Sequence, residues 1–215
     1  MAIQERAIRT RRKILEAAAT VFEQQGYQAA TITEILALVG LTKGSLYFHF
    51  KSKEELAQAI LDAQTDIAVP SHRIKLQELA DSGLLLAHLL QTDPLVRAGV
   101  HLTLQQHAVQ LNHHLSFHTW SRQNRQVLQL AQERGEVLPH VDIDEVGQLL
   151  VGAFAGIQAM SHAMSDYSDL PQRVSVLLRH VFPSIATPSV LGQLELGPDR
   201  SARLAEGRRG ADGPA

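Results

Sequence analysis

Apolar side chains recur every three or four residues along most of the chain, which is the spacing of one face of an α-helix. The first of these stripes predicts a helix over about residues 5–25, and it consists of Ile14, Leu15, Ala18, Val21 and Phe22. No run of residues alternates apolar and polar side chains in the way a half-buried strand does. The pattern therefore predicts an all-α protein.

Capping signals mark the ends of the next helices. Thr31-Ile-Thr-Glu34 and Ser52-Lys-Glu-Glu55 are both capping boxes, in which a hydroxyl residue is followed three positions later by glutamate. Between them, Gly40 suits the end of a second helix and Thr42 suits the cap of a third, over residues 43 to about 50. A fourth helix begins at the second box. Beyond it, the expected helices cover residues 72–91, 94–110, 116–134, 143–164, 171–181 and 189–206.

Residues 31–50 are thus two short helices joined by a tight turn at Gly40, which is the layout of a helix-turn-helix. On geometry alone, a corner of an ordinary helical bundle is an equally good interpretation. Side-chain chemistry favours DNA binding, because the exposed face of residues 42–49 is polar and Gly44 lets the backbone approach a surface closely. The polar side chains of this face are Thr42, Lys43, Ser45, Tyr47 and His49.

Positions along the third helix suggest separate roles for these side chains. Lys43 and Ser45 lie at its start, where the side chains of a recognition helix reach base edges. Tyr47 and His49 lie further along and suit phosphate or sugar. Lys53 lies where the next helix begins, and the free N–H groups and the dipole there suit a phosphate.

The distribution of charge supports this interpretation. Residues 1–53 carry eight basic and four acidic side chains, a net charge of +4, whereas the whole chain has a net charge of −2. The remaining residues therefore have a net charge of −6. A basic N-terminal part joined to an acidic remainder is expected when only the N-terminal part contacts phosphates. The basic run from Arg6 to Lys13 fits contact with the neighbouring DNA backbone or minor groove, and equally well an ordinary solvated helix face.

Several classes of protein are disfavoured by what the sequence lacks. The chain has no cysteine, which excludes disulfides and thiolate chemistry and fits a cytoplasmic location. Its most apolar stretch, residues 146–164, is interrupted by Gln148, Gln158 and His162 and is too polar for a membrane span. A nucleophile elbow, a phosphate-binding glycine loop and a dinucleotide fingerprint are all missing, so we expect neither an enzyme nor a cofactor.

Histidines were the remaining candidates for a metal site. His114 and His118 have the spacing that places two rings on one helix face, and His113 is adjacent. There is no cysteine and no obvious carboxylate to serve as a third ligand. We therefore expect no functional metal site.

The segment Thr42-Lys-Gly-Ser-Leu-Tyr-Phe-His-Phe50 with Lys51-Ser-Lys-Glu-Glu-Leu56 closely resembles the signature of the TetR family of bacterial repressors. Ile14-Leu-Glu-Ala-Ala-Ala19, Phe22, Gly26-Tyr27 and Thr31-Ile-Thr-Glu-Ile35 match the same pattern in order and spacing. The resemblance covers about 50 residues. It implies an Ω-shaped homodimer that binds a palindromic operator in double-stranded DNA. It also implies DNA contacts at Ser45, Tyr47, His49 and Lys53, together with Thr33, Lys43 and Gly44.

A looser resemblance, to the γ-butyrolactone-type autoregulator receptors of actinomycetes, spans most of the chain. It rests on Gln64, Arg97-Ala-Gly99, Phe117-x-x-Trp120, Gly135-Glu-x-Leu138 and Val151-Gly-x-Phe-Ala-Gly-Ile157. It implies a repressor that a small diffusible γ-butyrolactone or butenolide releases from promoters of secondary metabolism, including antibiotic production. A TetR-like repressor of an efflux or resistance gene, responding to a drug or antibiotic, is the alternative. A helical enzyme and a structural DNA-bending protein are more remote alternatives.

A pocket for such a ligand is expected to be largely apolar with a few polar groups. Trp120, the only tryptophan, offers a broad face and one N–H donor, and Gln64 offers a hydrogen bond to a carbonyl or hydroxyl. The further candidates, for which core packing is the competing interpretation, are Val100, Phe154, Ile157, Met160 and Ser161.

These expectations divide the chain into three parts. Residues 1–53 are the predicted helix-turn-helix DNA-binding domain, and residues 54–206 the helical ligand-binding and dimerisation domain. Residues 207–215 are predicted to be a flexible tail. Small residues in helix 143–164, with the helix at 171–181, are expected to supply the dimer's four-helix interface, and close packing within one chain is the alternative.

Overall fold

The computed structural model describes residues 2–65, 67–104 and 114–211, and these residues form eleven helices and no strand. The predicted all-α fold is confirmed. Within the described residues, no helix is both long and apolar enough to cross a membrane. The contacts between residues divide the chain into two compact units.

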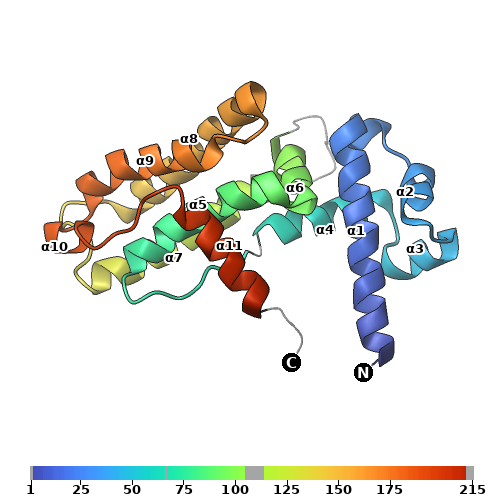
Figure 1. Ribbon diagram of the computed structural model, residues 1–215, viewed down its shortest axis with the longest axis horizontal. Coiled ribbons are helices and arrows are strands. Elements are labelled where there is room, and N and C mark those ends of the chain that lie inside the picture. The colour runs from blue at the N-terminus through green and yellow to red at the C-terminus, as the bar shows by residue number, and fades with distance from the viewer. Residues whose placement is uncertain (1, 66, 105–113, 212–215) are drawn as a thin grey trace. The chain divides into compact units, whose positions relative to one another are not determined.

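The first compact unit combines residues 1–66 with residues 93–116. Its helices, shown in Figure 1, are α1 (Ala2–Ala29), α2 (Ile32–Val39), α3 (Lys43–His49), α4 (Lys53–Thr65) and α6 (Pro94–Leu104). α1 packs against α2, α4 and α6. The apolar stripe predicted for the first helix is buried between these helices, as its helical spacing requires.

Local capping sets the boundary between α2 and α3. Thr31 and Glu34 form the predicted capping box: the Glu34 N–H donates to the Thr31 hydroxyl at 3.3 Å, and the Thr31 N–H donates to the Glu34 carboxylate at 2.9 Å. Gly40 ends α2 with a φ of 67°, a left-handed conformation that glycine adopts without strain. Thr42 then caps α3 by accepting from the Ser45 N–H at 3.3 Å. The predicted helix–turn–helix layout is therefore confirmed.

The second compact unit combines residues 67–92 with residues 117–215. Its helices are α5 (Lys75–Thr92), α7 (His114–Glu133, whose first turn belongs to the first unit), α8 (Ile143–Ser165), α9 (Leu170–Ile185), α10 (Pro188–Leu191) and α11 (Arg200–Ala211). α5 packs against α9 and α11, and α8 packs against α9. The buried Glu136 carboxylate caps α5 by accepting from the Lys75 and Leu76 N–H groups at 3.0 and 2.9 Å.

Polar bonds attach the C-terminal segment to α5. Nη2 of Arg200 donates to the Asp81 carboxylate at 2.8 Å, and the Gln77 amide donates to the Glu195 carbonyl at 3.1 Å. Asp81 is only 1% exposed, so Arg200 supplies the opposite charge that a buried carboxylate needs.

Two predicted helix boundaries in the C-terminal half are wrong. Residues 189–206 do not form one helix: α10 and α11 are separated by a non-helical segment that contains Gly192 and Gly197-Pro198. Glycine and proline there disfavour a continuous helix. The last helix also continues to Ala211, past the predicted start of the tail at residue 207, while residues 212–215 lie outside the described residues. The predicted division by function at residue 53 stays a prediction.

Candidate functional site

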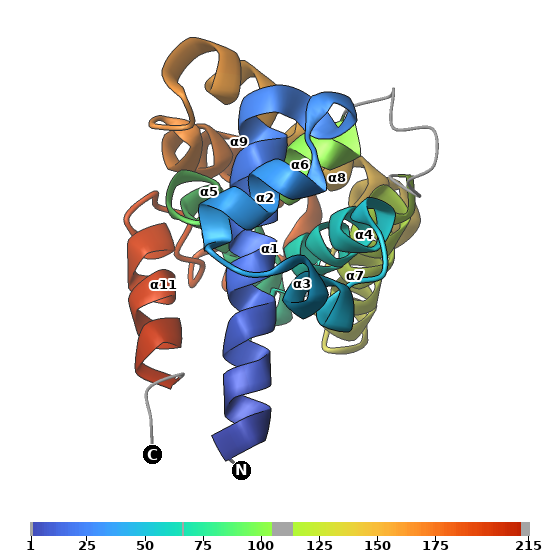
Figure 2. The same cartoon turned by 90° about the vertical axis from the view of Figure 1, so that its right-hand side faces the viewer.

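α3 presents one buried and one exposed side. Leu46 and the following Phe50 are buried in the core of the first unit, and they fix the orientation of the short helix. The opposite side is open to solvent, and α2 and α3 follow one another beside α1 in Figure 2. The predicted DNA contacts that are exposed are Thr33, Thr42, Lys43, Gly44 and Tyr47, while Ser45, His49 and Lys53 are half-buried.

Gly44 lies on this exposed side with open space around it. A Cβ built on its backbone would meet no atom within 4 Å, so nothing inside the protein requires a glycine here. Glycine in a helix costs about 0.5–1 kcal/mol relative to alanine. A residue that disfavours the helix and is not needed for packing fits a surface that another molecule approaches closely.

Aromatic rings add apolar area to the same side of α3. Tyr47 is 41% exposed and lies under the Lys43 ammonium, which is 5.8 Å from the ring centroid. Phe48 is 81% exposed and meets the His49 ring edge to face at 5.1 Å. Phe48 is not among the residues predicted from the sequence, although helical spacing would have indicated it. Two residues after the inward-facing Leu46, a side chain points to the opposite side of a helix.

Lys53 has a structural contact in addition to its predicted role. Its ammonium donates to the Gln28 carbonyl at 3.2 Å and lies 4.5 Å from the centroid of the Tyr27 ring. Burial lowers the pKa of Lys53, and burial with the Glu54 carboxylate raises the pKa of Tyr27 to about 12. Lys53 thus ties the start of α4 to the end of α1, and two N–H donors of its ammonium remain for a phosphate.

Basic side chains extend the candidate DNA surface along α1. The exposed members of this run are Arg6, Arg9, Arg11, Arg12 and Lys13. The Arg11 guanidinium lies 4.8 Å from the Phe50 ring centroid, and Arg12 pairs with Glu16 at 2.9 Å. The run is thus an exposed basic face of the same unit that carries α3.

Two of the predicted ligand residues, Gln64 and Val100, lie in the first unit. Both are buried. The Gln64 amide Nε2 donates to Thr103 Oγ1 at 2.6 Å and to Ser116 Oγ at 3.1 Å. α4 and α6 meet very closely here, because a Cβ on Gly99 would lie 2.9 Å from the Gln64 Cβ.

The other predicted ligand residues lie in the second unit and differ in exposure. Trp120 is half-buried and meets the Phe117 ring edge to face at 5.9 Å, and Phe154 and Ile157 are also half-buried. Met160 is 53% exposed in the single chain. A role for these residues in a ligand pocket stays a prediction.

Ser161 is buried and takes part in a local polar cluster. Its hydroxyl donates to the Asp169 carboxylate at 2.6 Å, and Ser165 donates to the same oxygen at 2.7 Å. These two hydroxyls, with the Arg173 guanidinium, lower the pKa of Asp169 to about 2. The contacts join the end of α8 to the start of α9. Gln158, one turn before Ser161, was missed as a site candidate; it is buried, and no donor in the described part of the chain reaches its Oε1.

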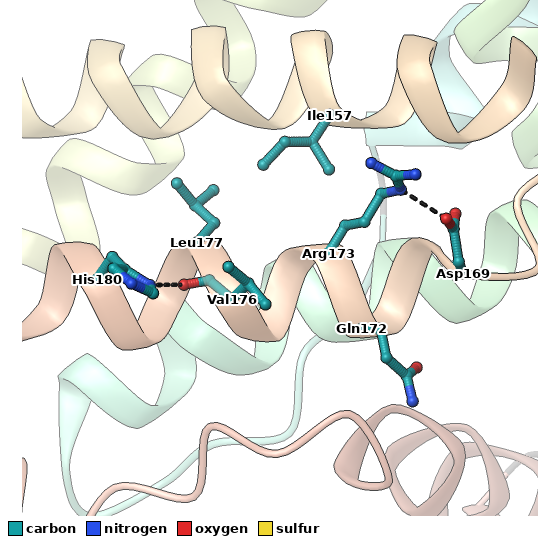
Figure 3. Close-up of a pocket in the computed structure, with 7 residues that line it drawn as sticks. All are labelled: Ile157, Asp169, Gln172, Arg173, Val176, Leu177 and His180. Carbon is teal, nitrogen blue, oxygen red and sulfur yellow. Dashed lines mark hydrogen bonds and ion pairs between the residues drawn. The ribbon is translucent and has the colours of Figure 1, made fainter. Parts of the chain in front are cut away.

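α8 and α9 form a groove of about 460 Å³. Figure 3 shows Ile157 of α8 pointing toward α9, with Arg173 and Leu177 between the two helices and Gln172 directed away from them. The remaining lining residues are Asp169, Val176 and His180. Large apolar side chains are exposed on the same two helices, namely Leu149, Met160, Met164 and Val176.

The described ranges contain no histidine cluster that could bind a metal ion. Residues 2–65, 67–104 and 114–211 contain no group of three histidine, aspartate or glutamate side chains that could hold a metal ion. His113, one of the three histidines considered in the sequence, lies outside these ranges.

Comparison with known proteins places this geometry in a family. Residues 14–60 match the model of bacterial regulatory proteins of the tetR family, and residues 74–185 match a tetracyclin repressor-like C-terminal domain. The A-factor receptor protein of Streptomyces griseus is 41% identical over 196 residues, which cover 91% of this chain and 70% of the relative.

Two solved structures show the same fold. TylP, a TetR regulator from Streptomyces fradiae, is 44% identical and superposes with a TM-score of 0.85 over 94% of this chain and 91% of its own. A γ-butyrolactone receptor described as an ArpA-like protein is 29% identical, with a TM-score of 0.69 over 94% of this chain and 98% of its own. The chain therefore belongs to the tetR family of bacterial regulatory proteins, which bind operator DNA as dimers.

Proposed function

We propose that the protein is a transcriptional repressor that binds a palindromic operator as a homodimer and is released by a γ-butyrolactone or butenolide. The observation that carries DNA binding is the exposed side of α3, where Gly44 is free of internal contacts and Tyr47 and Lys43 face solvent. The ligand class is supported by the names of two relatives, an A-factor receptor protein and a γ-butyrolactone receptor. The regulated genes would then be those of secondary metabolism, including antibiotic production.

In this proposal the start of α3 reads base edges and its surroundings hold phosphates. Lys43 and Ser45 would reach bases in the major groove, while Tyr47, His49 and Lys53 would contact the backbone. We expect a cytoplasmic protein, since operator DNA lies there, and no catalytic activity.

The second copy of the chain would pack on α8 and α9. Exposed Met160, Met164 and Val176 form apolar area that a monomer rarely leaves uncovered. Gly152 and Gly156 are exposed on α8, and a Cβ on either would meet nothing within 4 Å, so nothing within the described chain requires small residues there. The helices α8 and α9 of each copy would then form a symmetric four-helix interface.

Release requires the ligand to favour a state in which the recognition helix is displaced. α4 follows α3 directly in the sequence and ends beside Gln64, where it meets α6 at Gly99. A shift of α4 against α6 would therefore move α3. The two half-sites are read about one helical turn of DNA apart, so a displacement of a few ångströms spoils simultaneous binding.

Replacement of Gly99 by alanine is expected to disturb this contact. The new Cβ would lie 2.9 Å from the Gln64 Cβ and 3.0 Å from the Ile60 carbonyl oxygen, and the backbone oxygen can move only with α4. Overpacking of this kind costs about 1–3 kcal/mol, so we expect a lower melting temperature and roughly tenfold weaker operator binding without ligand. Calorimetry and fluorescence anisotropy measure the two effects.

Gly83→Ala is the matched control, because its Cβ would meet only Val174 at an ordinary 3.5 Å. If Gly99→Ala behaved like this control in both measurements, the α4–α6 contact would not govern operator affinity.

Operator binding tests the proposed function itself. Fluorescence anisotropy with the DNA upstream of the protein's own gene should show tight binding that weakens as salt rises, because phosphate contacts release counterions. A panel of γ-butyrolactones and butenolides should contain a compound that reverses the binding. Tight binding that none of them reverses would favour a drug-responsive repressor instead, and a lack of binding would contradict the DNA-binding assignment.

A further inference from the structure

Phe48 is the large apolar side chain that the protein exposes most within the described ranges. It is 81% exposed, whereas Leu46 and Phe50, two residues to either side, are 0% and 1% exposed. Single exposed apolar side chains are common on protein surfaces, so exposure alone does not indicate a contact. The position of Phe48 on α3 gives the additional information.

Leu46 lies in the middle of α3 and marks the side of the helix that faces the core. Each residue of an α-helix turns by about 100°, so Gly44 and Phe48, two residues before and two after Leu46, both lie roughly 160° away from it. They are four residues apart and are therefore neighbours in one row along the helix. This Gly44–Phe48 row is the ridge of α3 that lies farthest from the core.

Two polar rows flank this ridge. Lys43 and Tyr47 form one of them and are exposed, while Ser45 and His49 form the other and are half-buried. When a helix lies in the major groove, its outermost ridge meets the base edges at the floor of the groove. Its flanks meet the sugar–phosphate walls and the outer base edges. The Phe48 ring is therefore directed towards the floor of the groove.

Gly44 provides the depth that such a contact needs. It is exposed, and a Cβ on its backbone would meet nothing within 4 Å, so the ridge carries no side chain one turn before Phe48. A glycine at this place lets the helix backbone come close to the duplex. The ridge thus combines a close approach of the backbone with an apolar ring one turn later.

The floor of the major groove is lined by hydrogen-bond donors and acceptors and by one kind of apolar group, the C5 methyl of thymine. The phenylalanine side chain has no hydrogen-bonding group, so this methyl is the partner that suits it. We infer that Phe48 reads the methyl group of a thymine, so that each operator half-site carries a thymine under the second turn of α3 that determines affinity. This inference rests on the proposed function and adds one feature of the operator sequence.

Charge around the ridge favours DNA over an apolar protein partner. Residues 1–53 carry a net charge of +4, and the Lys43 ammonium lies beside the ridge, 5.8 Å from the centroid of the Tyr47 ring. An apolar partner that covered Phe48 would also enclose this ammonium without a countercharge, which is unfavourable. A duplex covers the ring and supplies phosphates and base acceptors for the ammonium.

Replacement of thymine by deoxyuridine tests the inference, because it removes the C5 methyl and leaves every hydrogen-bonding group in place. The probe is the segment upstream of the protein's own gene that the full-length protein protects from nuclease. Each thymine of a half-site is replaced in turn, together with its counterpart in the other half-site, and fluorescence anisotropy gives the dissociation constant. One buried methyl group corresponds to about fourfold in affinity, so the replacement at one position should weaken binding about 10- to 20-fold.

Variants assign this effect to one side chain. Phe48→Ala should weaken binding to the thymine duplex by a similar factor and bring the ratio of the dissociation constants of the uracil and thymine duplexes near one. Tyr47→Ala is the matched control, because Tyr47 is the other exposed aromatic residue of α3. It should weaken binding to both duplexes and preserve their ratio. Thermal melting shows that each variant is folded.

The outcomes separate this inference from the proposed function. If no replacement by deoxyuridine weakens binding, or if Phe48→Ala keeps the ratio of the normal protein, Phe48 does not read a thymine methyl, although the protein binds DNA. A ratio that falls to one in Tyr47→Ala and persists in Phe48→Ala would assign the methyl contact to Tyr47 instead. If the unmodified duplex is not bound at all, the DNA-binding assignment fails and this inference fails with it.

Discussion

Alanine at Gly44 is expected to keep or raise the thermal stability of the protein and to weaken operator binding about 10- to 100-fold. The stability should not fall because alanine favours a helix by about 0.5–1 kcal/mol and its Cβ would meet no atom within 4 Å. The affinity should fall because the added methyl group would stand between the α3 backbone and the DNA, at a loss of about 1.4–2.8 kcal/mol. Thermal melting and anisotropy on the operator measure the two quantities.

Gly207→Ala is the matched control for this substitution. Gly207 lies in α11, is exposed, and a Cβ there would also meet nothing within 4 Å. It should show the same gain in helix stability with no change in operator affinity. Full operator affinity in Gly44→Ala would mean that the exposed side of α3 does not approach DNA closely.

Lysine at Val176 is expected to dissociate the dimer and, with it, most of the operator affinity. Val176 is 46% exposed on α9 and lines the groove with Ile157. A lysine there would bring an unpaired charge into the proposed interface next to the guanidinium of Arg173, which already pairs with Asp169. Breaking an interface with a buried unpaired charge costs several kcal/mol, so we expect dissociation to become at least about 100-fold easier. Analytical ultracentrifugation measures the dissociation constant of the dimer, and fluorescence anisotropy measures the accompanying loss of operator affinity.

Leu130→Lys is a control of similar chemistry, since Leu130 is 43% exposed on α7 and does not line the groove. It should remain dimeric and bind the operator. A dimeric Val176→Lys, or a monomeric Leu130→Lys, would place the interface elsewhere.

The parts of the site that the sequence predicted are those that depend on local chemistry. The caps of Thr31 and Thr42 and the turn at Gly40 involve residues three or four positions apart, so their spacing is readable. Burial of Leu46 and Phe50 follows from helical periodicity. For the same reason, the all-α fold and the exposed side of α3 could be predicted without a structure.

The parts that could not be predicted depend on residues far apart in the chain. Lys53 reaches the Gln28 carbonyl, and Gln64 reaches both Thr103 and Ser116, 39 and 52 positions away. The sequence shows that Gln64 has a carbonyl and an amide but cannot show which of them is already used. Only the packing of α6 beside α4 brings Gln64 to Thr103, so this contact could not be read from the sequence.

The ion pair between Asp81 and Arg200 has a consequence for how this protein can evolve. Loss of Arg200 alone would leave a carboxylate buried without a countercharge, whereas loss of Asp81 alone would leave the guanidinium with the exposed Glu195, 3.0 Å away, as its acceptor. The two positions, more than a hundred residues apart, are therefore under a joint constraint. A substitution that removes Arg200 from the C-terminal segment is therefore expected to be tolerated only together with a compensating change at Asp81 in α5.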